Sequence, residues 1–388
     1  MTLDRKRKII YSWAIYDWAN SAFATTVMAG FFPLFFKAYW ANPDNPTEST
    51  FYLGIGNSIA SIIIAGFAPF LGAIADKGSS KKKFLILFAF LGIIMTGALS
   101  IVEQGYWQMA ILFYVLATIG FSSANTFYDS FLPHLDSKDR LDWISSLGYG
   151  LGYIGGGILF LINVLMFLKP STFGLVDQAM AIKVSFLMVA IWWAFFSIPI
   201  YLFVPEPKVN KDVTFFKSVK LGYLEIKETF QEIKKFKYVM LFLLSYWFYI
   251  DGVDTIVKMS VDYGLSIGFD SDSLITALLI VQFVAFPATL LYCKFGDWIG
   301  TKQAIYVAII GYSIITVLGY LMQEKWHFYA LAIFIGFFQG GIQALSRSLY
   351  SRIIPKNKTA EFFGFYNMLG KFAAVIGPAL MGIMTFYT

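Results

Sequence analysis

Long apolar blocks separated by short polar connections dominate the pattern of hydrophobic and polar positions along this chain. Each block has about the ~20 residues that a helix needs to cross ~30 Å of hydrocarbon. A backbone in lipid must satisfy its own hydrogen bonds, which a helix does within one segment. The pattern therefore predicts an all-α polytopic membrane protein with eleven spans, over residues 9–39, 51–75, 84–102, 107–130, 143–168, 181–204, 238–262, 272–293, 303–322, 327–349 and 361–386.

The charged residues are few and unevenly placed. They make up 14% of the chain, against about 25% in soluble domains. Of the 30 Lys and Arg residues, 24 fall at the N-terminus or in alternate connections on the same side, which the positive-inside rule makes cytoplasmic. We expect a monomer integral to a lipid bilayer, the bacterial cytoplasmic (inner) membrane, with a cytoplasmic N-terminus. The net charge of +6 then reflects topology, and no nucleic-acid partner is expected.

One long polar connection, residues 205–237, divides the chain into a bundle over 1–204 with six predicted spans and a bundle over 238–388 with five. Apolar residues recur in this connection at spacings of three and four, which predicts an amphipathic helix on the cytoplasmic membrane surface. The alternative is a partly ordered tether. The apolar positions are Phe216, Val219, Tyr223, Ile226, Phe230 and Ile233.

The two parts of the chain share a pattern of Trp, Asp four residues later, and Asn or Asp three residues further on. An ionisable side chain is expensive inside a bilayer, so each copy is a candidate functional site. The repetition predicts a duplicated membrane transporter. The two copies are Trp13, Asp17 and Asn20, and Trp247, Asp251 and Asp254.

A second repeat lies in the tight turns after the second and eighth predicted spans. Each turn has one Asp at the helix end, Asp76 or Asp297, and basic residues a few positions on. These turns resemble the characteristic loop of the major facilitator superfamily. The resemblance implies a major facilitator fold of two pseudo-symmetric helical bundles, with Asp76 and Asp297 as gate residues that tie neighbouring helices together in one access state. The alternative is that both are helix-end charges facing water.

Six motifs in chain order resemble the vacuole-effluxer-like branch of that superfamily, whose fungal members are linked to amino-acid efflux from the vacuole. The resemblance implies twelve helices, so we expect the twelfth to be missing from this sequence. The motifs are YDWANSAF at 16–23, FYDSFLP at 127–133, GYGLGYIGG at 148–156, DGVDT at 251–255, QGGIQALSRS at 339–348, and EFFGFYN at 361–367 followed by GKF at 370–372.

Polar residues within the spans are the candidate binding groups. Asp17 and Asn20 lie roughly 12 and 16 Å into the first span at ~1.5 Å per residue, and Lys371 lies near the middle of the eleventh. In the superfamily, spans one, four, seven and ten line the central cavity, so the resemblance implies that such groups face a substrate pathway.

The seventh span carries three further candidates. Asp251, Asp254 and Lys258 project from one face because they are three and four residues apart. We expect this face to point at the pathway. The alternative is that Asp254 and Lys258 neutralise each other as a packing pair.

Asp129 and Arg347 lie at the cytoplasmic ends of the fourth and tenth predicted spans, as counterparts in the two halves. They could close an inner gate by pairing across the pathway. The alternative is that Arg347 extends to lipid phosphate while Asp129 caps a helix end.

Carboxylates (Asp17, Asp251, Asp254) together with ammonium groups (Lys258, Lys371) suit a small-molecule substrate of both signs. We expect a secondary transporter for an amino acid or similar zwitterion, with protons as the second partner, because desolvation raises the pKa of a buried Asp. Asp17 and Asp251 are the predicted pair through which proton or cation occupancy biases the motion of the two halves.

Other activities have less support in the sequence. The two histidines, His134 and His327, lie at opposite predicted membrane faces, and no phosphate-binding Gly-Lys-Ser loop is present. We therefore expect no enzyme, no metal centre and no cofactor. Alternatives within the fold are transport of a divalent cation bound by Asn20, Asp251 and Asp254, transport of a lipid-like solute, and a non-transporting sensor.

Overall fold

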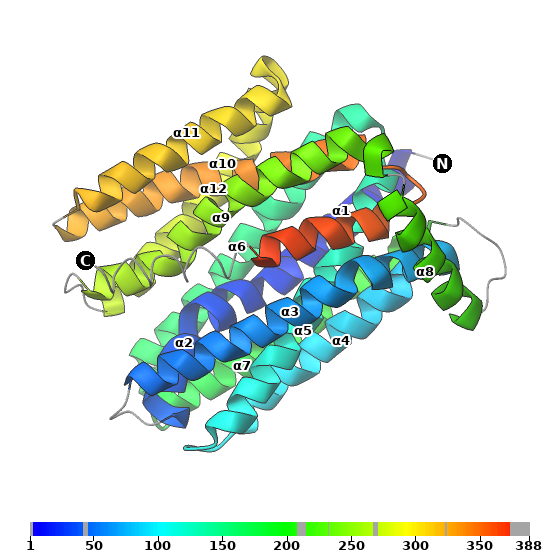
Figure 1. The fold of residues 1–388 in the computed structure, drawn as a ribbon. Helices are drawn as coiled ribbons and strands as arrows, with labels where there is room; N and C mark the ends of the chain where they lie inside the picture. Colours follow the sequence, from blue (N-terminus) through cyan, green and yellow to red (C-terminus); the bar gives the residue numbers. More distant parts are fainter. Residues whose placement is uncertain are drawn as a thin grey trace.

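The computed structural model describes residues 3–41, 46–207, 215–231, 233–266, 271–322 and 324–372. Helices account for nearly all of this part of the chain, and it contains no strand. The all-α prediction is confirmed. Figure 1 shows the helices running side by side in two groups, with α9 to α12 on one side and α1 to α7 on the other.

The helices follow the predicted apolar blocks. Among the described residues, ten helices are long and apolar enough to cross a membrane. The eleventh predicted span begins as a helix over residues 359–372, and its remainder lies outside the described residues. In chain order the elements are α1 (Leu3–Ala22), η1 (Phe23–Phe31), α2 (Phe32–Phe35), η2 (Phe36–Trp40), α3 (Pro46–Gly78), α4 (Lys81–Ala98), η3 (Leu99–Ile101), α5 (Trp107–Leu135), η4 (Lys138–Arg140), α6 (Leu141–Leu168), η5 (Pro170–Phe173), α7 (Gln178–Phe203), α8 (Phe215–Gln231), η6 (Ile233–Phe236), α9 (Lys237–Ser266), α10 (Ser271–Ile299), α11 (Thr301–Tyr320) and α12 (Lys325–Ile353).

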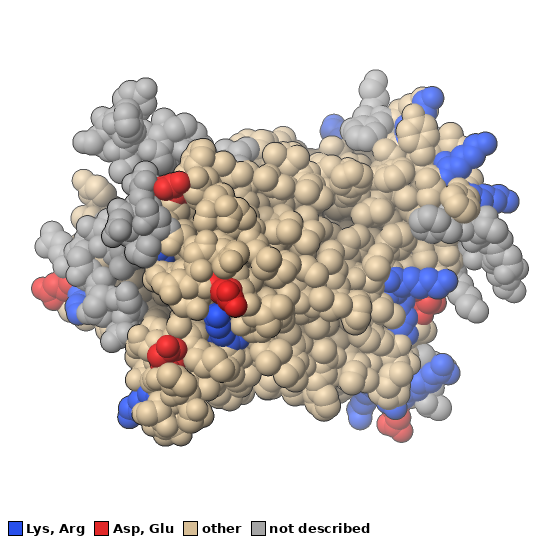
Figure 2. Space-filling view, turned by 90° about the horizontal axis from the view of Figure 1, so that it is seen from below, with Lys and Arg blue, Asp and Glu red and all other residues tan. Residues whose placement is uncertain are grey.

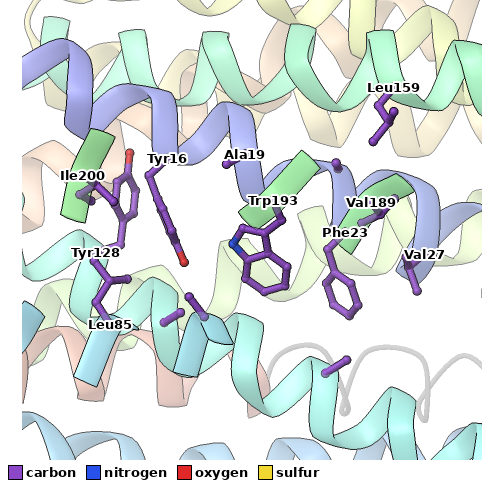
Figure 3. Packing of buried hydrophobic residues seen from close by; sticks show 14 of the residues in the cluster. Tyr16, Ala19, Phe23, Val27, Leu85, Tyr128, Leu159, Val189, Trp193 and Ile200 are labelled. Carbon is purple, nitrogen blue, oxygen red and sulfur yellow. The ribbon is translucent and has the colours of Figure 1, made fainter. Parts of the chain in front are cut away.

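Each group of helices has its own hydrophobic core. The first is built mainly from α1, α5, α6 and α7, and Figure 3 shows Trp193 lying between Tyr16 and Phe23 within it. The second is built from α9 to α12 and the helix over 359–372. Small residues bring the two groups together, since Gly150 of α6 packs against Phe286 and Leu290 of α10.

Residues 215–231 of the long connection form the helix α8. Its place on the membrane surface stays a prediction. In Figure 1, α8 lies at the same end of the bundle as the N-terminus. Figure 2 shows most of the visible Lys and Arg at that end as well. Just before α8, the Glu206 carboxylate accepts hydrogen bonds from the backbone N–H groups of Lys81 and Lys82, and so caps the start of α4.

Candidate functional site

A polar cavity of about 330 Å³ lies between the two groups of helices. Its wall is formed by α1, η1, α5 and α6 from the first group and by α9, α10, α12 and the 359–372 helix from the second. Part of the wall is π-helical, over Phe23–Phe31, a geometry often found at functional sites. The polar wall residues are Asp17, Asn20, Ser21, Thr25, Asn125, Tyr128, Asp129, Tyr149, Tyr153, Tyr246, Gln282, Gln339, Gln343, Arg347, Tyr366 and Asn367.

Arg347 of α12 crosses from the second group of helices into the first and is 2% exposed. Nη1 donates to Oδ1 of Asp129 at 2.9 Å and to Oδ2 of Asp17 at 3.3 Å. Nη2 donates to the same Asp17 oxygen at 3.3 Å and to the Ser145 carbonyl at 2.9 Å. Nε donates to the Ser145 hydroxyl at 2.9 Å. These contacts use all five N–H donors of the guanidinium.

Aromatic rings enclose this ion cluster. The guanidinium lies 4.1 Å from the ring centroid of Tyr149 and 5.0 Å from that of Trp13, within the range of cation–π attraction. The Tyr128 hydroxyl donates to Oδ2 of Asp17 at 2.8 Å, and the Trp13 indole N–H donates to the Tyr128 carbonyl at 3.0 Å. The first copy of the repeated pattern therefore holds its Asp in a fixed position against Arg347.

The cluster has one more negative than positive charge, because two carboxylates share one guanidinium. Both are buried, with Asp17 at 7% and Asp129 at 6% exposed. Arg347 and Tyr128 contact only Oδ2 of Asp17, and Arg347 contacts only Oδ1 of Asp129. A bound cation or proton would remove the excess charge, which is costly at low dielectric.

The cluster forms the floor of the cavity. The wall residues of the first span run from Asp17 to Ala29, away from the N-terminus. Those of α12 run from Arg347 back to Ile335. The cavity therefore extends from the ion cluster toward the end of the bundle opposite the N-terminus. The alternative that Arg347 extends to lipid phosphate is wrong, because its guanidinium pairs with Asp17 and Asp129 inside the protein.

Above the floor, the polar residues of the wall are uncharged and lie among apolar ones. Asn20 donates an amide hydrogen bond to Asn125 at 2.5 Å, and Tyr153 donates to Gln343 at 2.6 Å. The sequence analysis singled out Asn20 but missed Asn125 and Gln343 as wall residues. Periodicity placed them in spans, although only the packing of α5 and α12 shows that they face one cavity.

Below the floor, Asp76 joins the two groups of helices. It is 1% exposed, pairs with Lys81 at 2.9 Å and accepts a hydrogen bond from the Glu361 backbone N–H at 2.9 Å. Lys81 also donates to Thr359, whose hydroxyl donates to the Ser130 carbonyl at 3.0 Å. The end of α3 is thereby tied to the start of the 359–372 helix.

Asp297 does not have an equivalent position. It is exposed at the end of α10, and no ion pair of it occurs among the described residues. On this side the halves are joined by Asp142 at the start of α6, a residue that the sequence analysis missed. Asp142 accepts from Thr301 at 2.7 Å, pairs with Arg352 at 2.6 Å and also accepts from Ser348.

The second copy of the repeated pattern lies beside the cavity. Asp251 and Asp254 are half-buried on α9 and, like Lys371 of the 359–372 helix, are absent from the cavity wall as the described residues define it. The side chain of Lys258 lies outside the described residues.

Metal binding at this site depends on which side chains could act as ligands. Within the described ranges, no group of three or more His, Cys, Asp or Glu side chains is placed to hold a metal ion. The polar residues described in the cavity wall are mainly amides and tyrosines, with only two carboxylates, both engaged by Arg347.

A polar cavity between two groups of membrane-spanning helices, closed at one end by buried ion pairs, is the architecture of a secondary transporter. Residues 5–388 match the family described as vacuole effluxer Atg22 like, and the chain belongs to that family. The MFS-type transporter YxiO of Bacillus subtilis is 40% identical over 381 residues, which cover 96% of this chain and 87% of the relative. Autophagy-related protein 22 of Vanderwaltozyma polyspora is 23% identical over 469 residues, covering 100% and 87%.

Solved structures support the same fold. The proton:xylose symporter XylE has a TM-score of 0.69 at 14% identity, covering 99% of this chain and 90% of that one. A bacterial homologue of the iron transporter ferroportin, in an outward-facing state, has a TM-score of 0.66 at 11% identity, covering 98% and 92%. The predicted membership of the major facilitator superfamily, in its vacuole-effluxer-like branch, is confirmed.

Proposed function

We propose that this transporter moves an amino acid or a similar small zwitterion, coupled to protons, by alternating access. Its N-terminal end would face the cytoplasm of a bacterial cell, in keeping with the gathering of Lys and Arg there. The observation that carries the proposal is the floor of the cavity, where Asp17 and Asp129 share the single charge of Arg347.

The excess negative charge favours a cation at this floor. In the proposal, a substrate ammonium group or a proton binds Asp17 and competes with Arg347 for it. Because Arg347 is the link between α12 and the helices α1 and α5, weakening it lowers the free-energy cost of separating the two halves at this end. One carboxylate thus serves both substrate and proton.

The substrate carboxylate needs a different partner, because Asp129 and Ser145 still hold the Arg347 guanidinium when Asp17 is released. Asn367 lies in the cavity wall, and Lys371 is one helical turn further along the same face. We propose that Lys371 meets the carboxylate when the cavity rearranges, with the tyrosine hydroxyls and amides of the wall as further donors.

In this proposal, Asp251 and Asp254 of α9 are the binding groups of the second group of helices. Val257 lies in the cavity wall, and Asp254 is three residues before it, on a neighbouring part of the same face. Asp251, Asp254 and Lys258 would therefore enter the pathway as α9 moves, with Asp251 as the counterpart of Asp17. Asp76, Asp129, Arg347 and Asp297 are proposed as gate residues, although Asp297 makes no bridging contact with the residues that the structure describes.

Thermal stabilisation across amino acids, divalent metal ions and lysolipids, followed by uptake into proteoliposomes, tests this function. We expect stabilisation by amino acids and uptake driven by a proton gradient. Asp17→Asn and Asp251→Asn should each abolish coupled uptake while the protein stays folded. Uptake unchanged in both variants, or stabilisation only by metal ions or lysolipids, would remove the proposal.

A further inference from the structure

The helix α8 presents two opposite faces, and the buried face is the polar one. Ser218, Glu225 and Thr229 are 2%, 4% and 6% exposed, and they recur with Gly222 at spacings of three and four, so they share one face. Gly222 packs directly on the backbone of Ile74 near the end of α3, where a side chain would not fit. This face is therefore seated on the transporter itself.

Through this buried face, α8 bridges the two halves. The Glu225 carboxylate pairs with Lys77 of α3 and, at 2.8 Å, with Lys358 before the 359–372 helix. Lys358 also donates to the Thr229 hydroxyl at 3.2 Å. Burial alone would raise the pKa of Glu225, but its bonds to Lys358 and Lys77 outweigh it and lower the pKa. The bridge stays charged at neutral pH.

The opposite face of α8 is aromatic and basic, and the side chains described on it are exposed. Phe216 is 85% and Tyr223 62% exposed. Lys217, Lys220 and Lys227 are exposed beside them. Such a face fits a bilayer interface, in which rings enter the headgroup layer and lysines attract anionic lipids.

The position of α8 in the fold places its exposed face where a bilayer would contact it. It packs on residues 74–78 at the end of a helix that is long and apolar enough to span a membrane, and the ends of such helices lie near the headgroup layer. A protein partner would have to bind in the same layer, where the exposed rings and lysines of α8 match anionic lipid headgroups.

We propose that α8 is a clamp whose exposed face binds anionic lipid headgroups and whose Glu225 face holds the two halves together. Anionic lipid would then stabilise the closed state of this end. This regulation goes beyond the transport function and does not depend on the identity of the substrate.

The lipid contact is tested with a polarity-sensitive fluorophore. Cys293 is the one cysteine of the chain and is buried, so Tyr223→Cys is labelled in a Cys293→Ala background and reconstituted in phosphatidylcholine vesicles with or without phosphatidylglycerol. We expect a blue shift with phosphatidylglycerol that high salt reverses. The same label at Lys356→Cys, exposed at the same end of the bundle, should not shift.

A matched set of lysine variants separates α8 from general attraction. Lys217→Gln with Lys220→Gln and Lys227→Gln should remove the shift at position 223. The control, Lys294→Gln with Lys302→Gln and Lys356→Gln, removes three other exposed lysines and should keep it. A shift without phosphatidylglycerol, no shift at all, or equal loss in both sets would overturn the lipid contact.

Hydrogen exchange of residues 74–78 and 215–231 tests the clamp. We expect Glu225→Gln to speed their exchange by about tenfold or more, because it removes the buried carboxylate that joins Lys77 and Lys358. Glu228→Gln, an exposed carboxylate of the same helix, should have no effect. Phosphatidylglycerol should slow exchange in the wild-type protein but not in the triple variant of α8. Equal exchange in Glu225→Gln and wild type would refute the bridge, whatever the substrate proves to be.

Discussion

The two copies of the repeated turn join the halves of the transporter in different ways. In the first copy, Asp76 itself makes the joint, with Lys81 and the Glu361 backbone as partners. In the second, Asp297 is exposed and the joint depends on Asp142, which contacts Thr301 four residues after Asp297. Equivalent helix ends therefore meet in both copies, as the pseudo-symmetry requires. The acid that makes the contact lies in the turn itself in the first copy, and on the opposite helix, α6, in the second.

The largest expected difference is between the two repeated acids themselves. Asp76→Asn leaves the Lys81 ammonium, which is 0% exposed, without its ion-pair partner, and we expect a loss of about 3 kcal/mol in stability. Asp297→Asn should leave the melting temperature unchanged, because that side chain faces solvent. Thermal unfolding of the purified protein measures both, and equal losses would contradict the asymmetry.

The second prediction concerns the acid that replaces Asp297 in the joint. Asp142→Asn breaks the pair with Arg352 and weakens two hydrogen bonds, and we expect a loss of about 2 kcal/mol. A double-mutant cycle with Arg352→Gln should give a non-additive result. Additive losses would mean that Asp142 acts through some other contact.

Thr301→Val sharpens the comparison further. It removes the hydroxyl that Asp142 accepts from and that Arg352 contacts at 3.1 Å, at an expected cost of about 1 kcal/mol. Thr301→Ser keeps the hydroxyl and serves as the control in the same unfolding assay. If both variants lost the same stability, the methyl group rather than the hydrogen bond would be responsible.

The smallest effect is expected from Asp136, which bridges residues of the first half only. Burial would raise its pKa, but hydrogen bonds and ion pairs from Lys6, the Ser137 N–H and Arg140 outweigh burial and lower it below 3.8. This stabilisation is present above that value and is lost as the pH falls through the lowered pKa. Unfolding from pH 5 downward should therefore show a shallower acid dependence in Asp136→Asn, whereas an identical curve would exclude this contribution.

Much of the fold could be predicted from the sequence because apolar block length is a local signal. The spans, the amphipathic α8 and the family resemblance all depend on residues close together in the chain. Asp129 and Arg347 were identified as a candidate pair because repeat position relates them. The structure brings them within 2.9 Å of each other.

The rest of the site depends on contacts between distant segments. Asp17 was expected to act with Asp251, yet its ion-pair partner in the structure is Arg347, 330 residues away. Asp142 was missed because an acid at a helix start is commonplace. The one available signal was its correspondence to Glu361, which follows the start of the 359–372 helix in the same way.

The central claim is that the Asp17, Asp129 and Arg347 cluster closes the cavity toward the N-terminal end. The most direct measurement is the alkylation rate of Ala24→Cys, a cavity-wall position, by an impermeant reagent added from that end, in a Cys293→Ala background. Asp17→Asn and Arg347→Gln should each raise the rate, and the double variant should raise it little further, because both remove one joint. A rate that stays at the starting value in all three variants would contradict the account.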